Sequence, residues 1–191
     1  MLTTLAGCSS APPRNLDNVC EIFKEKNGWY KSSKNSYKQH GVPVHVQMAI
    51  MHQESRFRAE ARPERVWIFG VIPWFRPSTA YGFAQVKDET WKWYQDKRGG
   101  WFADRNVFDD ASDFIGWYGN IAHQRLKISK WDAYRQYLAY HEGHGGYERK
   151  SYLKKPWLVK VARKVKRRAS RYHTQLAGCE SELNRSWWWP F

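Results

Sequence analysis

Apolar residues recur every three or four positions along most of the chain, which is the spacing of helices that bury one face. The pattern predicts helices at about Leu16–Phe23, Trp29–Gln39, Val44–Glu54, 87–98, Asp110–Leu126, Lys130–Tyr140 and Trp157–Leu176. Asn15 is the expected cap of the first helix. Glycines after the last two helices, beginning at Gly143 and Gly178, are expected to end them.

The segment from 59 to 79 breaks the helical pattern, because it contains Pro63, Pro73 and Pro77. Proline lacks a backbone donor and clashes inside a helix, so we expect this segment to be mostly non-helical. A short hairpin around Val66–Ile72 fits its composition. Alternating strand patterns are nearly absent elsewhere. The sequence therefore predicts a mainly α protein with a mostly non-helical insertion at about 59–80.

The length of 191 residues suits one domain with short ends. We expect a tether at 1–14, a helical domain with its C-terminal helix at 15–179, and a tail at 180–191. The polar face of the C-terminal helix is strongly basic and carries Lys160, Arg163, Lys164, Lys166, Arg167, Arg168 and Arg171. A solvated surface is a sufficient structural interpretation of that face.

The chain has 32 Lys and Arg against 18 Asp and Glu, which gives a formal net charge of +14. Such an excess favours an anionic partner, whether nucleic acid, anionic lipid or an acidic polymer. No stretch approaches the roughly 20 apolar residues of a spanning helix, so we do not expect an integral membrane protein. Aromatic residues are 17% of the chain, which is more than a core of this size requires.

The chain has three cysteines, an odd number. Leu5-Ala6-Gly7-Cys8 looks like a bacterial lipobox, in which Cys8 becomes lipidated, and the following Ser9-Ser10-Ala11-Pro12-Pro13 suits a flexible tether. A chance match is the alternative, because only four residues precede the box and a signal peptide needs a longer apolar region. Lipidation at Cys8 would make the protein an exported lipoprotein.

Export would place Cys20 and Cys179 in an oxidising compartment, where a disulfide between them persists. Both residues lie beside predicted helices at opposite ends of the chain, so the bridge would close nearly the whole domain. The alternative is two buried free thiols.

Glu54 lies at the end of a predicted helix, and Met51 and Gln47 share its helical face. Apolar surroundings disfavour the charged carboxylate and raise its pKa, which keeps a carboxylic acid protonated near neutrality. Glu54 is therefore a candidate general acid. The alternative is an exposed glutamate at a helix end, close to Arg56 and Arg58.

Two further segments carry polar groups among apolar or small residues. Tyr81-Gly82-Phe83-Ala84-Gln85-Val86 holds an amide inside an apolar run, and Ala139-Tyr140-His141-Glu142-Gly143 runs from a helix end into a glycine-rich stretch. His141, Glu142 and His144 could suggest a metal site. No fourth ligand lies nearby and the spacing matches no zinc pattern, so we expect neither a metal nor a cofactor.

Together these segments resemble the lytic transglycosylase family with the fold of the soluble lytic transglycosylase (SLT) catalytic domain. That family has a Glu-Ser pair at a helix end, a Gly-Leu-Met-Gln segment and an Ala-Tyr-Asn-Ala-Gly segment, in that order. Here they are Glu54-Ser55, Gly82-Phe83-Ala84-Gln85 and Ala139-Tyr140-His141-Glu142-Gly143. The resemblance covers about 42–147 and looks closest to a lipoprotein subgroup with a basic C-terminal helix.

The resemblance implies a single lysozyme-like helical domain that cleaves peptidoglycan. It implies that Glu54 protonates the oxygen between N-acetylmuramic acid and N-acetylglucosamine, and then removes the proton of the sugar's own C6 hydroxyl. The product is a 1,6-anhydromuramoyl end, formed without water. By matched position, Ser55, Tyr81, Gln85 and Tyr140 would bind the sugars.

The sequence departs from the family in two places. Arg62–Ala80 is an insertion whose Trp67, Phe69, Trp74 and Phe75 could wall a sugar groove or pack onto the body. Glu142, also a candidate sugar-binding residue, replaces a small apolar residue and is the carboxylate that could convert the chemistry to hydrolysis. Because Glu142 follows Tyr140 by two residues, about 200° around a helix, we expect it to face away and pair with a basic residue.

Three functions stay open at this stage. The first is a lytic transglycosylase in the periplasm of a Gram-negative bacterium, anchored to the outer membrane through Cys8 and bound to peptidoglycan strands. The second is a hydrolytic muramidase of related fold. The third is a basic peptidoglycan-binding lipoprotein without activity. Nucleic acid is not expected as a partner, because export would separate the protein from the nucleic acid of the cell.

Overall fold

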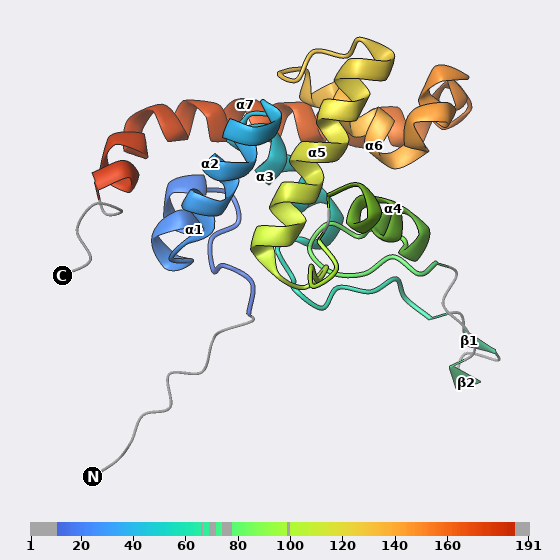
Figure 1. The fold of residues 1–191 in the computed structure, drawn as a ribbon, viewed down its shortest axis with the longest axis horizontal. Coiled ribbons are helices and arrows are strands. Elements are labelled where there is room, and N and C mark those ends of the chain that lie inside the picture. Colours follow the sequence, from blue (N-terminus) through green and yellow to red (C-terminus); the bar gives the residue numbers. More distant parts are fainter. Residues whose placement is uncertain (1–10, 66, 69–71, 74–77, 99, 186–191) are drawn as a thin grey trace.

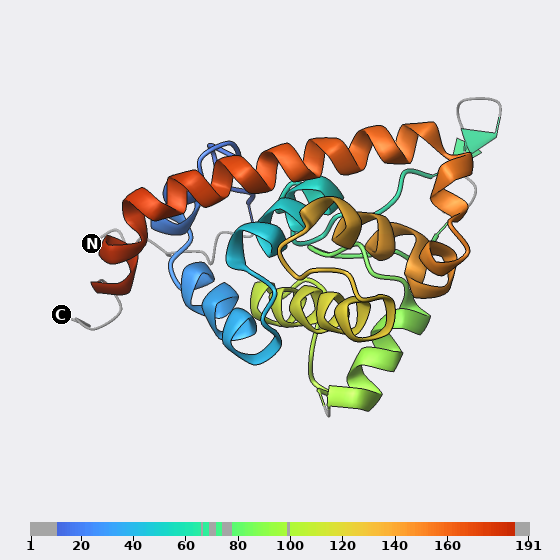
Figure 2. The same ribbon diagram turned by 90° about the horizontal axis from the view of Figure 1, so that it is seen from above.

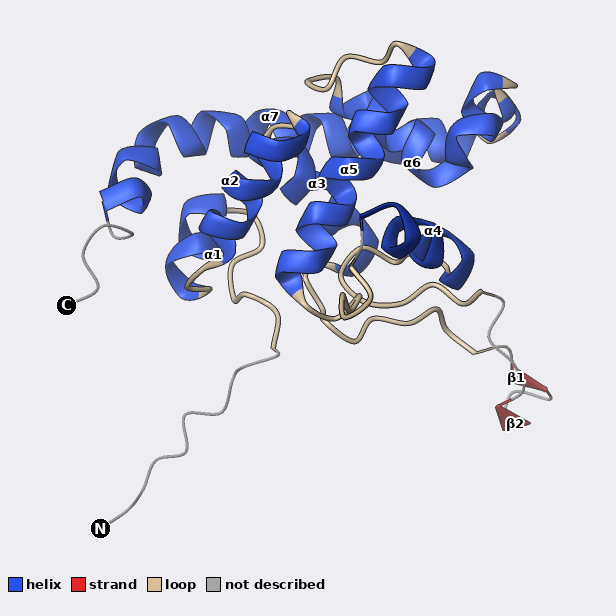
Figure 3. Cartoon of the chain, viewed as in Figure 1, coloured by secondary structure: helices blue, strands red, loops and turns tan. Residues whose placement is uncertain are grey.

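The structure is a computed structural model, and it describes residues 11–65, 67–68, 72–73, 78–98 and 100–185. These residues form the helices α1 (Val19–Glu25), α2 (Trp29–His40), α3 (Val44–Ser55), α4 (Asp88–Arg98), α5 (Phe108–Leu126), α6 (Ala133–Glu148) and α7 (Pro156–Arg185), with the 3₁₀ turn η1 (Ser151–Lys154). Figure 3 shows that helices dominate the fold, so the mainly α prediction is confirmed. No helix in the described part of the chain is long and apolar enough to cross a membrane.

Helix α3 lies inside the molecule because it is apolar on nearly every side, and residues 44–51 are all buried. It packs against α2, α5, α6 and α7. Helix α7 runs along one side of the molecule in Figure 2 and covers α3 and α6. This arrangement brings the C-terminal end of α3 to the wall of a cavity, and the end of α3 is where Glu54 lies.

The described residues of the insertion are non-helical, as predicted from its prolines. β1 (Trp67–Ile68) pairs with β2 (Ile72–Pro73) in an antiparallel hairpin, with Ile68 opposite Ile72. The two strands lie apart from the helices in Figure 1. The expected roles of the aromatic residues of this insertion fall outside the described side chains.

The predicted N-cap of the first helix is wrong. Asn18 caps α1, since its side chain accepts hydrogen bonds from the backbone N–H groups of Cys20 and Glu21. The side chain of Asn15 instead accepts from the N–H of Asp17, 3.1 Å away, in a turn before the helix. Both Asn15 and Asn18 precede the helix, and Asn18, three residues further on, has the capping geometry.

Of the two helix ends predicted at glycines, the one at Gly143 is confirmed and the one at Gly178 is wrong. Gly143 has φ 71° and ψ 159°, which are non-helical angles that interrupt α6, and a second helical stretch follows to Glu148. Helix α7 passes through Gly178 and ends at Arg185. Cys179 and Leu183 stay buried on the face that α7 already presents to the core, and this burial favours continuing the helix.

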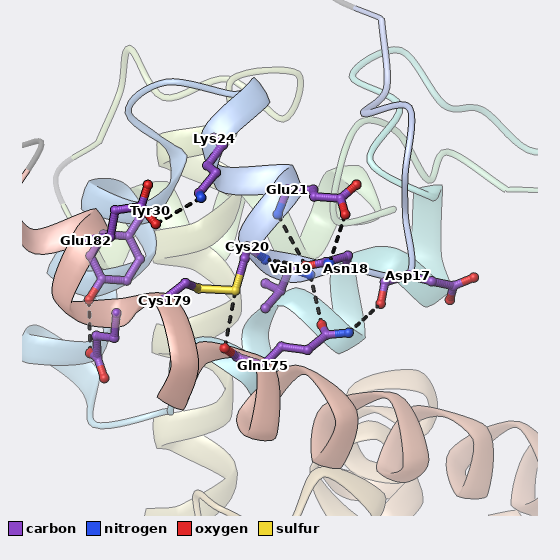
Figure 4. The surroundings of a disulfide bond; sticks show 11 residues. Asp17, Asn18, Val19, Cys20, Glu21, Lys24, Tyr30, Gln175, Cys179 and Glu182 are labelled. Carbon is purple, nitrogen blue, oxygen red and sulfur yellow. Dashed lines mark hydrogen bonds and ion pairs between the residues drawn. A yellow bond between two sulfur atoms is a disulfide. The ribbon is translucent and has the colours of Figure 1, made fainter.

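A disulfide joins the two ends of the domain, as predicted. Cys20 in α1 and Cys179 in α7 are 159 residues apart in sequence, with Cα atoms 6.1 Å apart (Figure 4). Beside the bridge, the Gln175 side chain accepts from the N–H of Val19 at 3.0 Å and donates to the carbonyl of Asp17 at 3.0 Å. For a loop this long, the chain-entropy account gives about 4–5 kcal/mol of stabilisation.

Candidate active site

A cavity of about 440 Å³ opens where the end of α3, the segment before α4, the middle of α5 and the second half of α6 meet. Its walls are made by Glu54, Ala80, Gln85, Val86, Lys87, Thr90, Phe114, Tyr118, Tyr140, His141, Glu142 and Gly143. The fold therefore brings together all three segments that the sequence singled out. Such a volume is in the usual range of ligand-binding clefts.

Glu54 is the carboxyl group at the inner wall of this cavity. Helix α3 ends immediately after it, because Arg56 and Phe57 adopt left-handed backbone angles with φ 53° and 60°. Burial raises the pKa of Glu54 to about 7, and a hydrogen bond from the Tyr137 hydroxyl opposes that rise. A carboxyl group with this pKa can give up a proton and take one back near neutral pH.

The glycine of the second segment is required by close backbone packing. Gly82 has φ 79°, and a Cβ atom there would lie 2.0 Å from the backbone oxygen of Arg105. The turn that it permits points Gln85 at the cavity. The Gln85 amide nitrogen donates to the carbonyls of Ala61, at 2.8 Å, and Gly82, at 3.0 Å, so its oxygen is the part of the amide left for a ligand.

Tyr140 ties the third segment to the second. Its hydroxyl donates to the carbonyl of Ala84 at 2.6 Å, and its ring packs edge-on against Tyr118, with centroids 5.6 Å apart. Burial, followed by the charge of Glu54, raises the pKa of Tyr140 well above its usual value, so it stays a neutral donor. Tyr140 thus forms a rigid wall beside Glu54.

Two of the predicted site residues do not line the cavity. Ser55 is fully buried, and its hydroxyl donates to the Met51 carbonyl one helical turn back, at 3.3 Å. The Tyr81 ring is covered by the guanidinium groups of Arg62 and Arg105, whose carbon atoms lie 4.2 and 5.4 Å from its centroid. Both side chains are thus engaged in contacts within the protein beside the site.

Glu142 borders the cavity but its carboxylate is fully engaged. Lys155 Nζ lies 2.7 Å from Oε1, the Ser151 hydroxyl donates to Oε2, and His141 Nδ1 is 3.2 Å from Oε1. The side chain is only 2% exposed. Burial would raise the pKa of Glu142, but the bonds from Lys155, Ser151 and His141 outweigh it and lower the pKa. The expected pairing of Glu142 with a basic residue is confirmed, but the expectation that Glu142 faces away from the site is wrong, because it lines the cavity beside the kink at Gly143.

The third member of the suggested metal set points elsewhere. His144 is buried, its ring stacks on Tyr118 with centroids 4.1 Å apart, and its Nε2 lies 3.3 Å from the Tyr118 carbonyl. Burial lowers its pKa to about 4, so the ring is neutral and acts as packing for a cavity wall. Within the part of the chain that the structure describes, no three such side chains converge on a metal position.

Sequence reasoning missed several residues of the site. Tyr137 is buried, hydrogen-bonds Glu54 and precedes Tyr140 by one helical turn on the same face of α6. That i, i+3 spacing is the signal that could have identified it. Lys87, directly before α4, and Thr90, in its first turn, also line the cavity, and only the packing of α4 against the body reveals them.

The sequence profile of the family described as "Transglycosylase SLT domain" matches residues 1–179. The match spans most of the chain, so the chain belongs to this family, whose members are in general lytic transglycosylases acting on peptidoglycan. A search of curated proteins and a search of solved structures found no match. The SLT resemblance and the lysozyme-like helical fold are thereby confirmed, whereas the lipoprotein subgroup stays a prediction.

Proposed function

We propose that the protein is a lytic transglycosylase that cleaves the β-1,4 bond between N-acetylmuramic acid and N-acetylglucosamine in peptidoglycan, with Glu54 as the only catalytic acid and base. One observation carries the proposal. A single carboxyl group in the cavity has a pKa raised to about 7, while the second one is held ionised by its own partners.

The reaction requires one group to work twice. Glu54, protonated, gives its proton to the glycosidic oxygen as the bond from that oxygen to C1 of the muramoyl ring breaks, and the substrate's N-acetyl group stabilises the cationic carbon. The C6 hydroxyl oxygen then bonds to C1, and its proton passes to the Glu54 carboxylate. Acid and base are restored and no water enters the product. A pKa close to the working pH suits both half-reactions.

The walls beside Glu54 supply positioning. Gln85 and Tyr140 both line the cavity and are the groups we assign to holding the sugars. The aromatic rings of Phe114, Tyr118 and Tyr140 offer broad, rigid contact surfaces to sugar faces. We do not assign Ser55 or Tyr81 to substrate contact.

The surroundings of Glu142 argue against hydrolysis by a second carboxylate. A hydrolase of the inverting kind needs a free carboxylate to activate water across the sugar from the acid. Glu142 accepts from Lys155 and Ser151, so its oxygens are occupied. The muramidase alternative therefore lacks its base among the residues that line the cavity.

We further propose that the protein works in the cell envelope, attached through a lipid on Cys8. The Leu5-Ala6-Gly7-Cys8 box, the short tether after it and a family that acts on the wall support this location. The net charge of +14 suits both carboxylates of the wall's stem peptides and anionic lipid. Mass spectrometry of Cys8 in exported protein tests the lipid, and a mature chain that retains Leu5–Gly7 would contradict it.

Product analysis tests the enzymatic proposal. Purified protein is incubated with isolated sacculi, and released fragments are analysed by mass spectrometry. We expect 1,6-anhydromuramoyl ends. Reducing muramic acid ends would favour the muramidase, and binding to sacculi without release would favour the non-enzymatic lipoprotein.

A further inference from the structure

A second hollow, of about 240 Å³, lies where α2, α7 and the start of α3 meet, under the indole of Trp131 (elements in Figure 2). We call it the Trp131 hollow. It is lined by Lys34, Tyr37, Pro43, Val44, His45, Trp131, His173, Leu176, Ala177 and Glu180. None of these residues contributes to the catalytic cavity.

Three aromatic rings stand together in the hollow. The Trp131 indole is 57% exposed, although it packs on His45 and His173 with centroids 5.3 and 6.0 Å apart. The imidazoles of His45 and His173 lie 4.6 Å apart. A large, flat and apolar ring is thus held in place by neighbours while much of it faces solvent.

The hollow is electrically balanced on a protein that is strongly basic. Lys34 and Glu180 in its lining form an ion pair with Nζ and Oε1 2.5 Å apart. Burial, and then the charge of His173, lower the pKa of His45 to about 4, so that imidazole is neutral. A phosphate or an anionic lipid would find no unpaired lysine or arginine side chain in this lining.

The lining also offers polar contacts beside the apolar indole. His45 is only 8% exposed, and its imidazole makes ring contacts and no hydrogen bond with any described residue. Pro43, the N-cap of α3, supplies no side-chain acceptor, and its carbonyl accepts from Val46 and Gln47, so only the N–H groups before them lack an acceptor within the helix. A ligand that has hydroxyl and carbonyl groups on its edges and an apolar face for an indole matches this combination.

We propose that the Trp131 hollow binds one saccharide ring of the same glycan polymer that the catalytic cavity cleaves; the identity of that polymer rests on the proposed function. Its volume is below the usual range of pockets for larger ligands, which suits a single ring. The sugar's apolar face lies on Trp131, and its polar groups meet His45 and the start of α3.

The hollow and the cavity lie on opposite sides of α3. His45 and Glu54 are nine residues apart on one helix, which is about 14 Å along the axis and about two and a half turns around it, so their side chains leave opposite sides. One disaccharide cannot fill both places. The hollow therefore holds a neighbouring strand, or a distant part of the same strand, and increases retention on a network of glycan chains by making attachment bivalent.

Binding is tested in the full chain carrying Glu54→Gln, so that cleavage does not interfere. Tri-N-acetylchitotriose is titrated while the indole N–H resonances are followed by NMR, and retention on sacculi is measured in parallel. We expect the Trp131 resonance to shift with the ligand. Adding Trp131→Ala should weaken retention on sacculi about five- to tenfold, and Trp131→Tyr should recover part of it.

Trp101→Ala is the matched control, because Trp101 is 70% exposed and lines neither the cavity nor the hollow. It should change retention less than twofold. Equal losses for the two alanine variants, or an unmoved Trp131 resonance while cavity resonances shift, would overturn the proposal. A wild type that fails to cleave but still shows the Trp131 shift would count against the proposed function and leave the saccharide site standing.

Discussion

Two carboxyl groups border one cavity, Glu54 at the end of α3 and Glu142 in α6, directly before the kink at Gly143. Glu54 has apolar neighbours and a single hydroxyl, that of Tyr137, so burial raises its pKa to about 7. Glu142 has an ammonium, a hydroxyl and an imidazole around it, and these lower its pKa although its side chain is only 2% exposed. The comparison shows that the partners of a carboxyl group, more than its exposure, decide whether it is an acid or a fixed charge.

The largest expected effect comes from removing the acid. Glu54→Gln keeps the shape of the side chain but takes away the proton donor and acceptor, so we expect cleavage of sacculi to fall about 10³-fold or more. The measurement is the initial rate of muropeptide release, with sacculus binding as the control for folding. Turnover near the wild-type rate would remove Glu54 from the mechanism.

Breaking the disulfide should lower the stability of the fold and leave the pKa of Glu54 unchanged. We expect Cys20→Ser with Cys179→Ser to lower the free energy of unfolding by about 2–5 kcal/mol in denaturant titration. The bridge braces α1 against α7, whereas burial and Tyr137 set the pKa of Glu54, so the pH profile of cleavage should not move. A shift in the pH profile of cleavage would mean that the pKa of Glu54 depends on the distant Cys20–Cys179 disulfide.

Glu142→Gln tests whether the second carboxyl group of the cavity takes part in the chemistry. Because Glu142 is assigned no proton transfer, and because Lys155 is 41% exposed and can be solvated when unpaired, we expect the cleavage rate to fall by about tenfold or less. The products should still carry anhydro ends. Loss as severe as that of Glu54→Gln would reveal a chemical role, and reducing ends from the wild type would point to water activation.

The smallest effect is expected from Tyr137→Phe. In the wild type, kcat/KM should fall as pH rises through about 7, where Glu54 loses its proton. The Tyr137 hydrogen bond favours the ionised carboxyl, so its removal should raise the pKa of Glu54 and move this limb to higher pH, with a rate loss of a few-fold. A limb that moves to lower pH would mean that Tyr137 stabilises the protonated form.

Much of the helical architecture follows from local pattern. Apolar spacing located the helices, and the helical face that Glu54 shares with Met51 already indicated that its carboxyl group would meet apolar neighbours. The helix break at Gly143 was also predicted, and its backbone angles are non-helical. Errors arose at Asn15 and Gly178, because Asn18 caps the first helix and the burial of Leu183 favours a longer C-terminal helix.

The site was less predictable because its contacts join distant segments. Motif order identified Glu54, Gln85 and Tyr140, all of which line the cavity. It could not show that the Ser55 hydroxyl turns back to its own helix, since adjacency to Glu54 in sequence says nothing about side-chain direction. Glu142 is held by Lys155 and Ser151, which come from a turn beyond the motif. Only the folded chain places them beside Glu142.

The most direct test of the account is a pH titration of the two glutamates themselves. Carboxyl carbon shifts in protein labelled with ¹³C-glutamate, assigned by Glu54→Gln and Glu142→Gln, report each pKa in the free enzyme. The account predicts that Glu54 titrates at about 7 and that Glu142 titrates below the ordinary glutamate value of 4.5. A Glu54 carboxyl that ionises near 4.5, or a Glu142 carboxyl that holds its proton to higher pH than Glu54, would contradict the assignment of Glu54 as the single acid and base.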